Sequence, residues 1–274
     1  MRVGIDFGTT NSSAALVLGK IVEAVKNPFA MQFGYSFPSS FCVDKDGEVL
    51  LADLAEQEMG DSPRGYKRSV KRDLGQKEPY TLNGRKFLPE ELIVEFLAML
   101  KGEAEKRIST SLSAAVITVP ATYDSEQLLL MEQAAQAAGF KSVMSVAEPI
   151  AAAIYYDQVN KEKYQLKNGD YLLVYDFGGG TFDASLVRRN GLNYEFLHNE
   201  GETVGGEDID KMIYNDWLKT ARQVFREMLS EELYVDISNK NAARRNQIDV
   251  LRMCRDVKHR LSSMAEALQW HFLS

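Results

Sequence analysis

Two short segments of the sequence place an aspartate directly before a turn of glycine and threonine. The first is DFGTTN at Asp6–Asn11, and the second is DFGGGTFD at Asp176–Asp183. Turns of this composition let backbone N–H groups approach an anion closely, because glycine has no Cβ. A carboxylate at the strand end suits a hydrated Mg²⁺, which keeps several waters and takes one or two protein carboxylates. One such turn predicts little, but a facing pair predicts a site that grips the phosphates of a nucleotide from two sides.

The two segments share their local context, which indicates an internal repeat. Residues 3–17 read VGIDFGTTNSSAALV, and residues 174–187 read VYDFGGGTFDASLV. Each is an apolar run, a tight turn and a second run of small and apolar residues, which is typical of strand, turn and strand. The second copy continues through the hairpin signal Asn190–Gly191. We therefore predict that a whole lobe has been duplicated.

The remaining elements must position these turns, and their pattern is that of an α/β protein. Apolar periodicity and end signals predict helices over Pro89–Ile108, Asp124–Ala138, Pro149–Tyr156, Asp208–Leu229 and Ala242–Leu268. Short apolar runs predict strands at Ala114–Val119 and Ser142–Val146, and the polar stretch Asp157–Asp170 is predicted to connect two lobes. Such alternation predicts mixed sheets with helices packed against them.

The composition excludes several classes of function. The chain has 274 residues, a formal net charge of −7 and a pI near 5.2, which argues against a nucleic-acid partner. Cys42 and Cys254 match no metal or redox spacing, and no apolar run is long enough to cross a membrane. Because residues 1–8 enter a strand at once, we expect no signal peptide and a cytoplasmic location. The sequence lacks both a Walker A motif and the catalytic-loop motif of protein kinases.

Five stretches together resemble the ATPase domain of the 70-kDa heat-shock (DnaK-like) chaperones, in the order found in that family. They are GIDFGTTNS at Gly4–Ser12, ITVPATY at Ile117–Tyr123, AEPIAAAIYY at Ala147–Tyr156, YDFGGGTFDASLV at Tyr175–Val187 and GGEDID at Gly205–Asp210. The resemblance implies an actin-like ATPase (ribonuclease H-like) α/β fold with two lobes and duplicated mixed sheets. The first lobe is expected at 1–166. The second is expected at 167–274, with a helical subdomain from about residue 205.

The resemblance also implies the roles of individual residues, with ATP or ADP and Mg²⁺ as cofactors. Asp6 and Asp176 would hold Mg²⁺ through water, and the catalytic residues would be Lys71, Glu148, Asp176 and Thr181. Nucleotide would be bound by Gly8, Thr9, Thr10, Asn11, Gly178, Gly179, Gly180, Thr181, Gly205, Gly206, Lys258 and Ser262.

From the residues alone, some of these assignments have equally plain alternatives. The run KRSVKR around Lys71 is also typical of a solvated surface. Glu148, which precedes a proline, also fits the end of a strand, and Asp183 fits either a metal site or a hairpin cap.

The sequence departs from the family pattern at four positions. Arg255 stands where an acidic residue is usual, and His259 where an adenine-stacking arginine is usual. Leu128 and Met144 replace arginines that the family uses in interdomain and J-domain signalling, which argues against coupling to a J-domain co-chaperone.

In the resembled family the ATPase domain continues beyond this sequence, and a peptide-binding domain follows it. We therefore expect the second lobe to be incomplete, nucleotide binding to be weak and turnover to be low or absent. The implied partners are client polypeptides, bound through a domain outside this sequence, and a nucleotide-exchange factor.

Two other functions remain open on the sequence. One is a non-catalytic, nucleotide-dependent interaction module or truncated paralogue, which the truncation and the substitutions at Arg255 and His259 favour. The other is an actin-like filament protein, since such proteins share the two hairpins.

Overall fold

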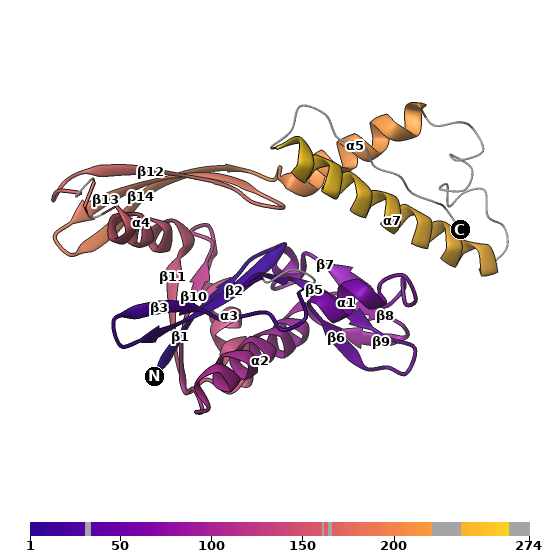
Figure 1. Ribbon diagram of the computed structural model, residues 1–274, viewed down its shortest axis with the longest axis horizontal. Coiled ribbons are helices and arrows are strands. Elements are labelled where there is room, and N and C mark those ends of the chain that lie inside the picture. Colours follow the sequence, from indigo (N-terminus) through magenta and orange to yellow (C-terminus); the bar gives the residue numbers. More distant parts are fainter. Residues whose placement is uncertain (31–33, 161, 164–165, 221–236, 263–274) are drawn as a thin grey trace.

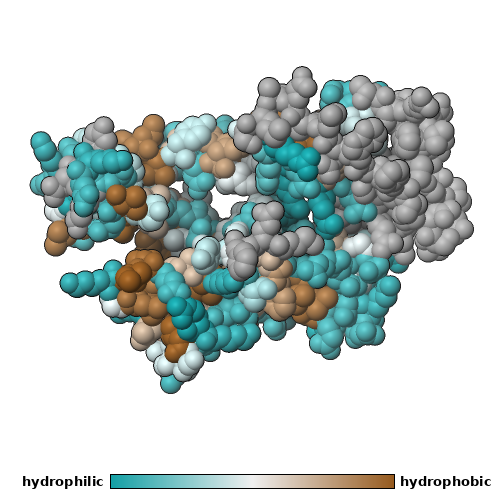
Figure 2. Space-filling model, in the orientation of Figure 1, coloured by the Kyte–Doolittle hydropathy of each residue, from teal (hydrophilic) through white to brown (hydrophobic). Residues whose placement is uncertain are grey.

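The computed structural model describes residues 1–30, 34–160, 162–163, 166–220 and 237–262. In Figure 1 these residues form a lower lobe, built around the sheet that contains the N-terminus, and an upper part that contains a second sheet and two long helices. Figure 2 shows that the surface is hollowed between the two.

The sheet of the lower lobe carries the first hairpin at its centre. Its strand order is β11-β10-β1-β2-β3, and β4 also pairs with β2. The strands are β1 (Arg2–Phe7), β2 (Asn11–Leu18), β3 (Ile21–Ala24), β4 (Phe37–Pro38), β10 (Ala114–Val119) and β11 (Ser142–Ala147). β1 runs antiparallel to β2 and parallel to β10, with Asp6 opposite Ser13 on one side and Thr118 on the other. The first hairpin is therefore anchored to the sheet along both edges of β1.

The second sheet repeats the hairpin but is smaller. It is the antiparallel meander β12 (Tyr171–Phe177), β13 (Phe182–Asn190) and β14 (Asn193–Glu202). Asp176 lies opposite Asp183, and Gly191, with φ 63°, turns β13 into β14. Helix α4 (Glu148–Val159) touches strands of both sheets and lies between them in Figure 1.

Shorter elements complete the wall of the lower lobe next to the cleft. They are β5 (Ser40–Val43), β6 (Val49–Leu51), α1 (Asp53–Glu58), β7 (Tyr66–Arg68), the 3₁₀ helix η1 (Val70–Asp73), β8 (Tyr80–Leu82) and β9 (Arg85–Phe87). In the upper part, α5 (Gly206–Thr220) packs beside α7 (Ile237–Leu261), and Figure 1 shows both on the same side as α1 and β7.

The hydrophobic core belongs mainly to the lower lobe. Helix α2 (Pro89–Ile108) buries Phe96 with no exposed surface, and its ring lies 5.5 Å from Phe7 and 5.4 Å from Phe41. Helix α3 (Ser125–Ala137) begins with a capping box in which the Asp124 side chain accepts from the Gln127 N–H. A smaller cluster joins Tyr214 on α5 to Val250 and Cys254 on α7.

The predicted elements agree with the structure except at some ends. The helix over Pro89–Ile108 and the strand over Ala114–Val119 are confirmed at both bounds. The helix predicted over Pro149–Tyr156 instead spans Glu148–Val159, so the start of the predicted connection at Asp157 is helical. Asp157 extends the helix because its buried carboxylate forms an ion pair with Arg189 at 2.9 Å. The last parts of the helices predicted to end at Leu229 and Leu268 lie outside the described residues. Among the described helices, none has the length and apolarity needed to span a membrane.

Candidate functional site

The turns of the two hairpins meet at close range. A Cβ on Gly179 would lie 1.5 Å from the Thr10 hydroxyl oxygen, and one on Gly180 would lie 1.7 Å from Nη2 of Arg72. The Thr10 Oγ1 atom is buried and has no hydrogen-bond partner among the described residues. A side chain at either position would have to displace Thr10 or Arg72 of the opposite lobe, and glycine leaves both in place.

Each turn is also held from within its own lobe. Ser39 donates its hydroxyl to the Gly8 carbonyl at 2.7 Å, and its N–H donates to the Thr10 carbonyl at 2.9 Å. In the second turn the Gly178 N–H donates to the Thr181 carbonyl at 2.9 Å. The backbone of both turns is thus fixed before any ligand arrives.

Below the turns, charged side chains from four separate segments converge. Lys71 of η1 is buried and places its Nζ 2.5 Å from Oε1 of Glu148, the first residue of α4. Asp6, the penultimate residue of β1, accepts from the Thr118 hydroxyl at 2.7 Å, and Asp176 is the penultimate residue of β12. The KRSVKR run is therefore not a solvated surface at Lys71, and Glu148 begins a helix directly after β11.

The pKa values in this cluster reflect burial and the closeness of several carboxylates. Burial raises the pKa of Glu148; the charge and hydrogen bond of Lys71 act in the opposite direction, and the carboxylates of Asp6 and Asp176 raise it further. Burial also raises the pKa of Asp176, with added repulsion from Asp183 and Asp6. The cluster therefore has more negative charge than Lys71 neutralises.

A short chain of polar side chains supports Asp183 on the second sheet. The Asn199 side-chain amide donates to Asp183 Oδ1 at 2.9 Å, and the Ser185 hydroxyl donates to Oδ1 of Asn199 at 2.6 Å. Asp183, Glu148 and Asp176 line a cavity of about 270 Å³ beneath the turns. Asp183 therefore faces the carboxylate cluster, in addition to its place in the hairpin.

The N-terminus of α5 is joined to the second turn by its backbone. The Gly206 and Glu207 N–H groups donate to the carbonyls of Gly178 and Gly179 at 3.0 and 2.7 Å. A Cβ on Gly205 would lie 2.5 Å from the Gly180 nitrogen, so only glycine fits there. The segment GGEDID thus packs directly on the turn that follows Asp176.

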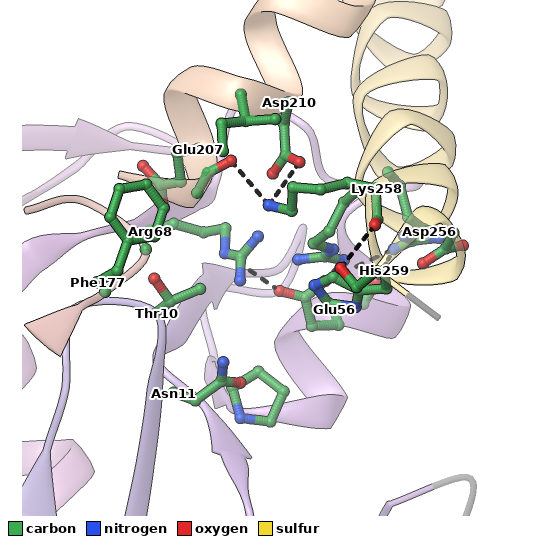
Figure 3. Close-up of a pocket in the computed structure, with 18 of the residues that line it drawn as sticks. Thr10, Asn11, Glu56, Arg68, Phe177, Glu207, Asp210, Asp256, Lys258 and His259 are labelled. Atoms are coloured by element: carbon green, nitrogen blue, oxygen red, sulfur yellow. Dashed lines mark hydrogen bonds and ion pairs between the residues drawn. The ribbon is translucent and has the colours of Figure 1, made fainter. Parts of the chain in front are cut away.

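A larger cavity of about 810 Å³ opens beside the turns, with walls from both lobes. Lys258, His259 and Ser262 of the α7 segment lie on one side, and Asp53, Glu56 and Gln57 of α1 lie on the other. Figure 3 shows Lys258 reaching from α7 toward α5, where its Nζ lies 2.7 Å from the Gly206 carbonyl and 2.6 Å from Asp210 Oδ1.

Glu56 joins the two lobes across this cavity. It accepts from the hydroxyls of Ser40 and Tyr66 at 2.5 and 2.6 Å. Arg68 of the lower lobe lies 3.5 Å from its carboxylate, and Arg255 of α7 lies 3.6 Å away. Arg252 of α7 donates to the Glu56 carbonyl at 2.7 Å. Burial raises the pKa of Glu56, but the nearby charge of Arg68, the two hydroxyl hydrogen bonds and the charge of Arg255 together hold it below 4.5.

The predicted site residues are thus divided between two neighbouring places. Asp6, Lys71, Glu148 and Asp176 meet beneath the turns, and Lys258 and Ser262 line the large cavity. Asn11 lies at the cavity edge, and Thr9 lies in the first turn between Gly8 and Thr10. Sequence reasoning missed Glu56 and Arg68; only the basic run around Lys71 hinted at Arg68.

The donor set fits a hydrated Mg²⁺ better than a metal bound directly by a cage of side chains. Among the described residues no group of three or more His, Cys, Asp or Glu side chains forms a metal site. Asp6 and Asp176, at the ends of equivalent strands, match an ion that keeps most of its waters.

The mixed α/β architecture, with two hairpins whose glycine turns meet between the lobes, is consistent with the actin-like ATPase fold. The sequence profile of the family described as "Hsp70 protein" matches residues 79–273. The chain belongs to the Hsp70 family.

Among curated proteins, the chain is similar to several named chaperone protein DnaK. That of Ureaplasma urealyticum is 34% identical over 251 residues, covering 90% of this chain and 40% of the relative. That of Methanothermobacter thermautotrophicus is 33% identical over 217 residues, covering 78% of this chain and 35% of the relative. The chain thus spans about two fifths of the length of the curated relatives it matches.

Proposed function

We propose that this chain is the nucleotide-binding ATPase module of an Hsp70-type chaperone, which binds Mg–ATP between its lobes and hydrolyses the γ-phosphate by in-line attack of water. The observation that carries the proposal is the convergence of Asp6, Lys71, Glu148 and Asp176 beneath two facing glycine turns.

In this proposal the two turns hold the β- and γ-phosphates through backbone N–H groups and the hydroxyls of Thr9, Thr10 and Thr181. The buried Thr10 hydroxyl, which lacks a partner among the described residues, is available to a phosphate oxygen. Mg²⁺, held through water by Asp6 and Asp176, would supply positive charge that neutralises the phosphate oxygens.

Lys71 and Glu148 would divide the chemistry between them. The Lys71 ammonium, buried at the cleft floor, would turn from Glu148 to the γ-phosphate and stabilise the charge that builds up in the transition state. Glu148, whose pKa is raised by burial and by neighbouring carboxylates, would orient the attacking water and accept a proton from it.

The nucleoside would occupy the large cavity against α7. Lys258 and Ser262 lie on its wall, and His259 offers an imidazole face where the family has an arginine. Lys258 is already paired with Asp210 and the Gly206 carbonyl, so contact with a ribose would compete with those bonds. This competition is consistent with weak nucleotide binding.

The test compares Lys71→Met with Lys67→Met. Both lysines lie in the same basic run, but Lys67 pairs with Asp73 at 3.0 Å, away from the carboxylate cluster. Single-turnover hydrolysis of radiolabelled ATP, with protein in excess, detects slow chemistry even when binding is weak. We expect Lys71→Met to lower the rate about 100-fold or more and Lys67→Met to leave it unchanged. Equal rates for wild type and Lys71→Met would refute the mechanism.

A non-catalytic, nucleotide-dependent interaction module is the second candidate. It is favoured by two ion pairs, Lys71 with Glu148 and Lys258 with Asp210. Both ammonium groups are already engaged by carboxylates in the structure. It predicts nucleotide-dependent changes in protease sensitivity with no phosphate release in the same single-turnover assay.

Client polypeptides and a nucleotide-exchange factor are the proposed partners of the whole protein. Leu128 and Met144 are 36% and 52% exposed, so the positions where the family pattern has arginines are open to a partner. We expect a J-domain protein to leave the ATPase rate of this chain unchanged, because leucine and methionine cannot form bidentate ion pairs.

A further inference from the structure

Ser69, two residues before Lys71, has an unusual backbone. Its φ of 58° and ψ of 28° lie in the left-handed region, where a serine is strained. It stands at the N-terminus of η1, and its carbonyl accepts from the Arg72 N–H at 3.1 Å. This turn places Val70 in the hydrophobic core and Lys71 against Glu148.

The side chain of Ser69 contacts the other lobe. Its hydroxyl donates to Oε1 of Glu207 at 2.8 Å, a contact between residues 138 positions apart. Glu207 belongs to the first turn of α5, and its N–H donates to the Gly179 carbonyl of the second glycine turn at 2.7 Å. A continuous path of hydrogen bonds therefore joins the segment that carries Lys71 to the opposite phosphate turn.

Arg72, on the other side of Lys71, also reaches this turn. Its guanidinium occupies the space beside Gly180, and its charge acts on Asp208 of α5, whose pKa it helps to lower after the Gly205 N–H and Lys211. Ser69 and Arg72, which lie on either side of Lys71 in the sequence, thus both contact the second lobe.

We propose that Ser69 is a positioning residue that makes the orientation of Lys71 depend on closure of the two lobes, through its hydrogen bond to Glu207. Closure places Glu207 where it accepts from Ser69 and supports the strained turn that aims Lys71 into the cleft. With the lobes apart, Ser69 lacks this partner and the turn loses its support. The predicted effect of Ser69 on hydrolysis rests on the proposed function, but its predicted effect on the orientation of Lys71 does not.

Ser109 supplies a matched control. It is also a serine in the left-handed region, with φ 52° and ψ 34°, but it ends α2 and is exposed, away from the cleft. Ser69→Ala and Ser109→Ala keep a Cβ, and therefore keep the same kind of backbone strain at positive φ. Only the first removes a hydroxyl that faces the second lobe.

The first measurement is chemical labelling of Lys71 in the nucleotide-free chain. Acetic anhydride labelling followed by mass spectrometry gives the reactivity of Lys71 relative to the exposed Lys20. We expect Lys71 to be labelled several-fold faster in Ser69→Ala and Glu207→Ala than in wild type or Ser109→Ala. Equal labelling in all four proteins would overturn the inference.

The second measurement is a double-mutant cycle on single-turnover hydrolysis. Ser69→Ala and Glu207→Ala should each lower the rate about 10-fold, as expected for one hydrogen bond to a charged group, with little change in the Kd for ATP. The double variant should be no slower than either single variant; independent, multiplying effects would overturn the inference. If the wild-type chain hydrolyses no ATP, the proposed function fails, while the labelling result still decides the role of Ser69.

Discussion

Strands β1 and β12 occupy equivalent places in the two hairpins, with Asp6 and Asp176 at the same step, but their surroundings differ. The three apolar residues that alternate along one face of β1 are at most 1% exposed, whereas their counterparts on β12 are 46–69% exposed. These residues are Val3, Ile5 and Phe7 on β1, and Leu173, Tyr175 and Phe177 on β12.

The cause of the difference is packing beyond the hairpin itself. β1 is paired on both edges and covered by α2, whereas β12 pairs with β13 alone among the described strands. Helix α4 contacts the second sheet, on the side of Val174. Both hairpins form all the same, because strand pairing and the glycine turns define them locally. The stability of each lobe is a separate property, set by distant segments.

The largest expected effect compares the two lobes directly. Phe96→Ala removes a fully buried ring that contacts Phe7 and Phe41, and should lower the free energy of unfolding by about 3–5 kcal/mol. Tyr175→Ala, at a side chain 69% exposed, should change it by less than about 0.5 kcal/mol. Urea denaturation followed by circular dichroism measures both. A large loss in Tyr175→Ala would mean that the face of β12 is covered in solution.

The two glycine turns should respond differently to alanine. A Cβ on Gly8 would lie 2.2 Å from the Asn11 carbonyl of its own turn, so Gly8→Ala must distort backbone and should cost about 2 kcal/mol of stability. The same change at Gly179 meets the Thr10 side chain of the opposite lobe. Gly179→Ala should therefore leave stability nearly unchanged and weaken ATP binding, as measured by calorimetry. Equal losses of stability in both variants would contradict this difference between the turns.

A substitution of Glu56 tests the ionic contact between the two lobes. Its pKa is held below the ordinary value of 4.5, so the ionised form adds stability above pH 4.5, and that stability is lost as the pH falls through the lowered pKa. Glu56→Gln keeps an acceptor for Ser40 and Tyr66 but loses the attraction to the arginines, and should cost about 1 kcal/mol at pH 7. Thermal melts should show the two proteins converging in stability below pH 4.5. A difference that is constant with pH would rule out the ionic contribution.

A smaller effect is expected at the helix cap of α3. Asp124→Ala removes the acceptor for the Gln127 N–H and should lower stability by about 1 kcal/mol or less, because the cap is exposed to water. Asp124→Asn, which retains an acceptor, is the matched control in the same denaturation experiment. A loss as large as that of Phe96→Ala would show that the cap supports more than its own helix.

The two hairpins and the presence of the helices could be predicted from sequence, because they depend on neighbours along the chain, whereas several helix ends differ from the prediction. Strand alternation, a glycine turn and an N-cap act over a few residues, so Asp6 and Asp176 could be identified from the sequence alone. The end of α4 differs from the prediction because Asp157 pairs with Arg189, which lies on strand β13, 32 positions away along the chain.

By itself the sequence determined where the two glycine turns lie and which aspartate precedes each. Only the tertiary structure decided that Lys71 forms an ion pair with Glu148. It also decided that Glu56 lies beside arginines of both lobes, and that Ser69 donates a hydrogen bond to Glu207. Charge and residue type do not specify a partner dozens of positions away. Packing of the lobes brings these groups together, and burial then makes their interactions strong.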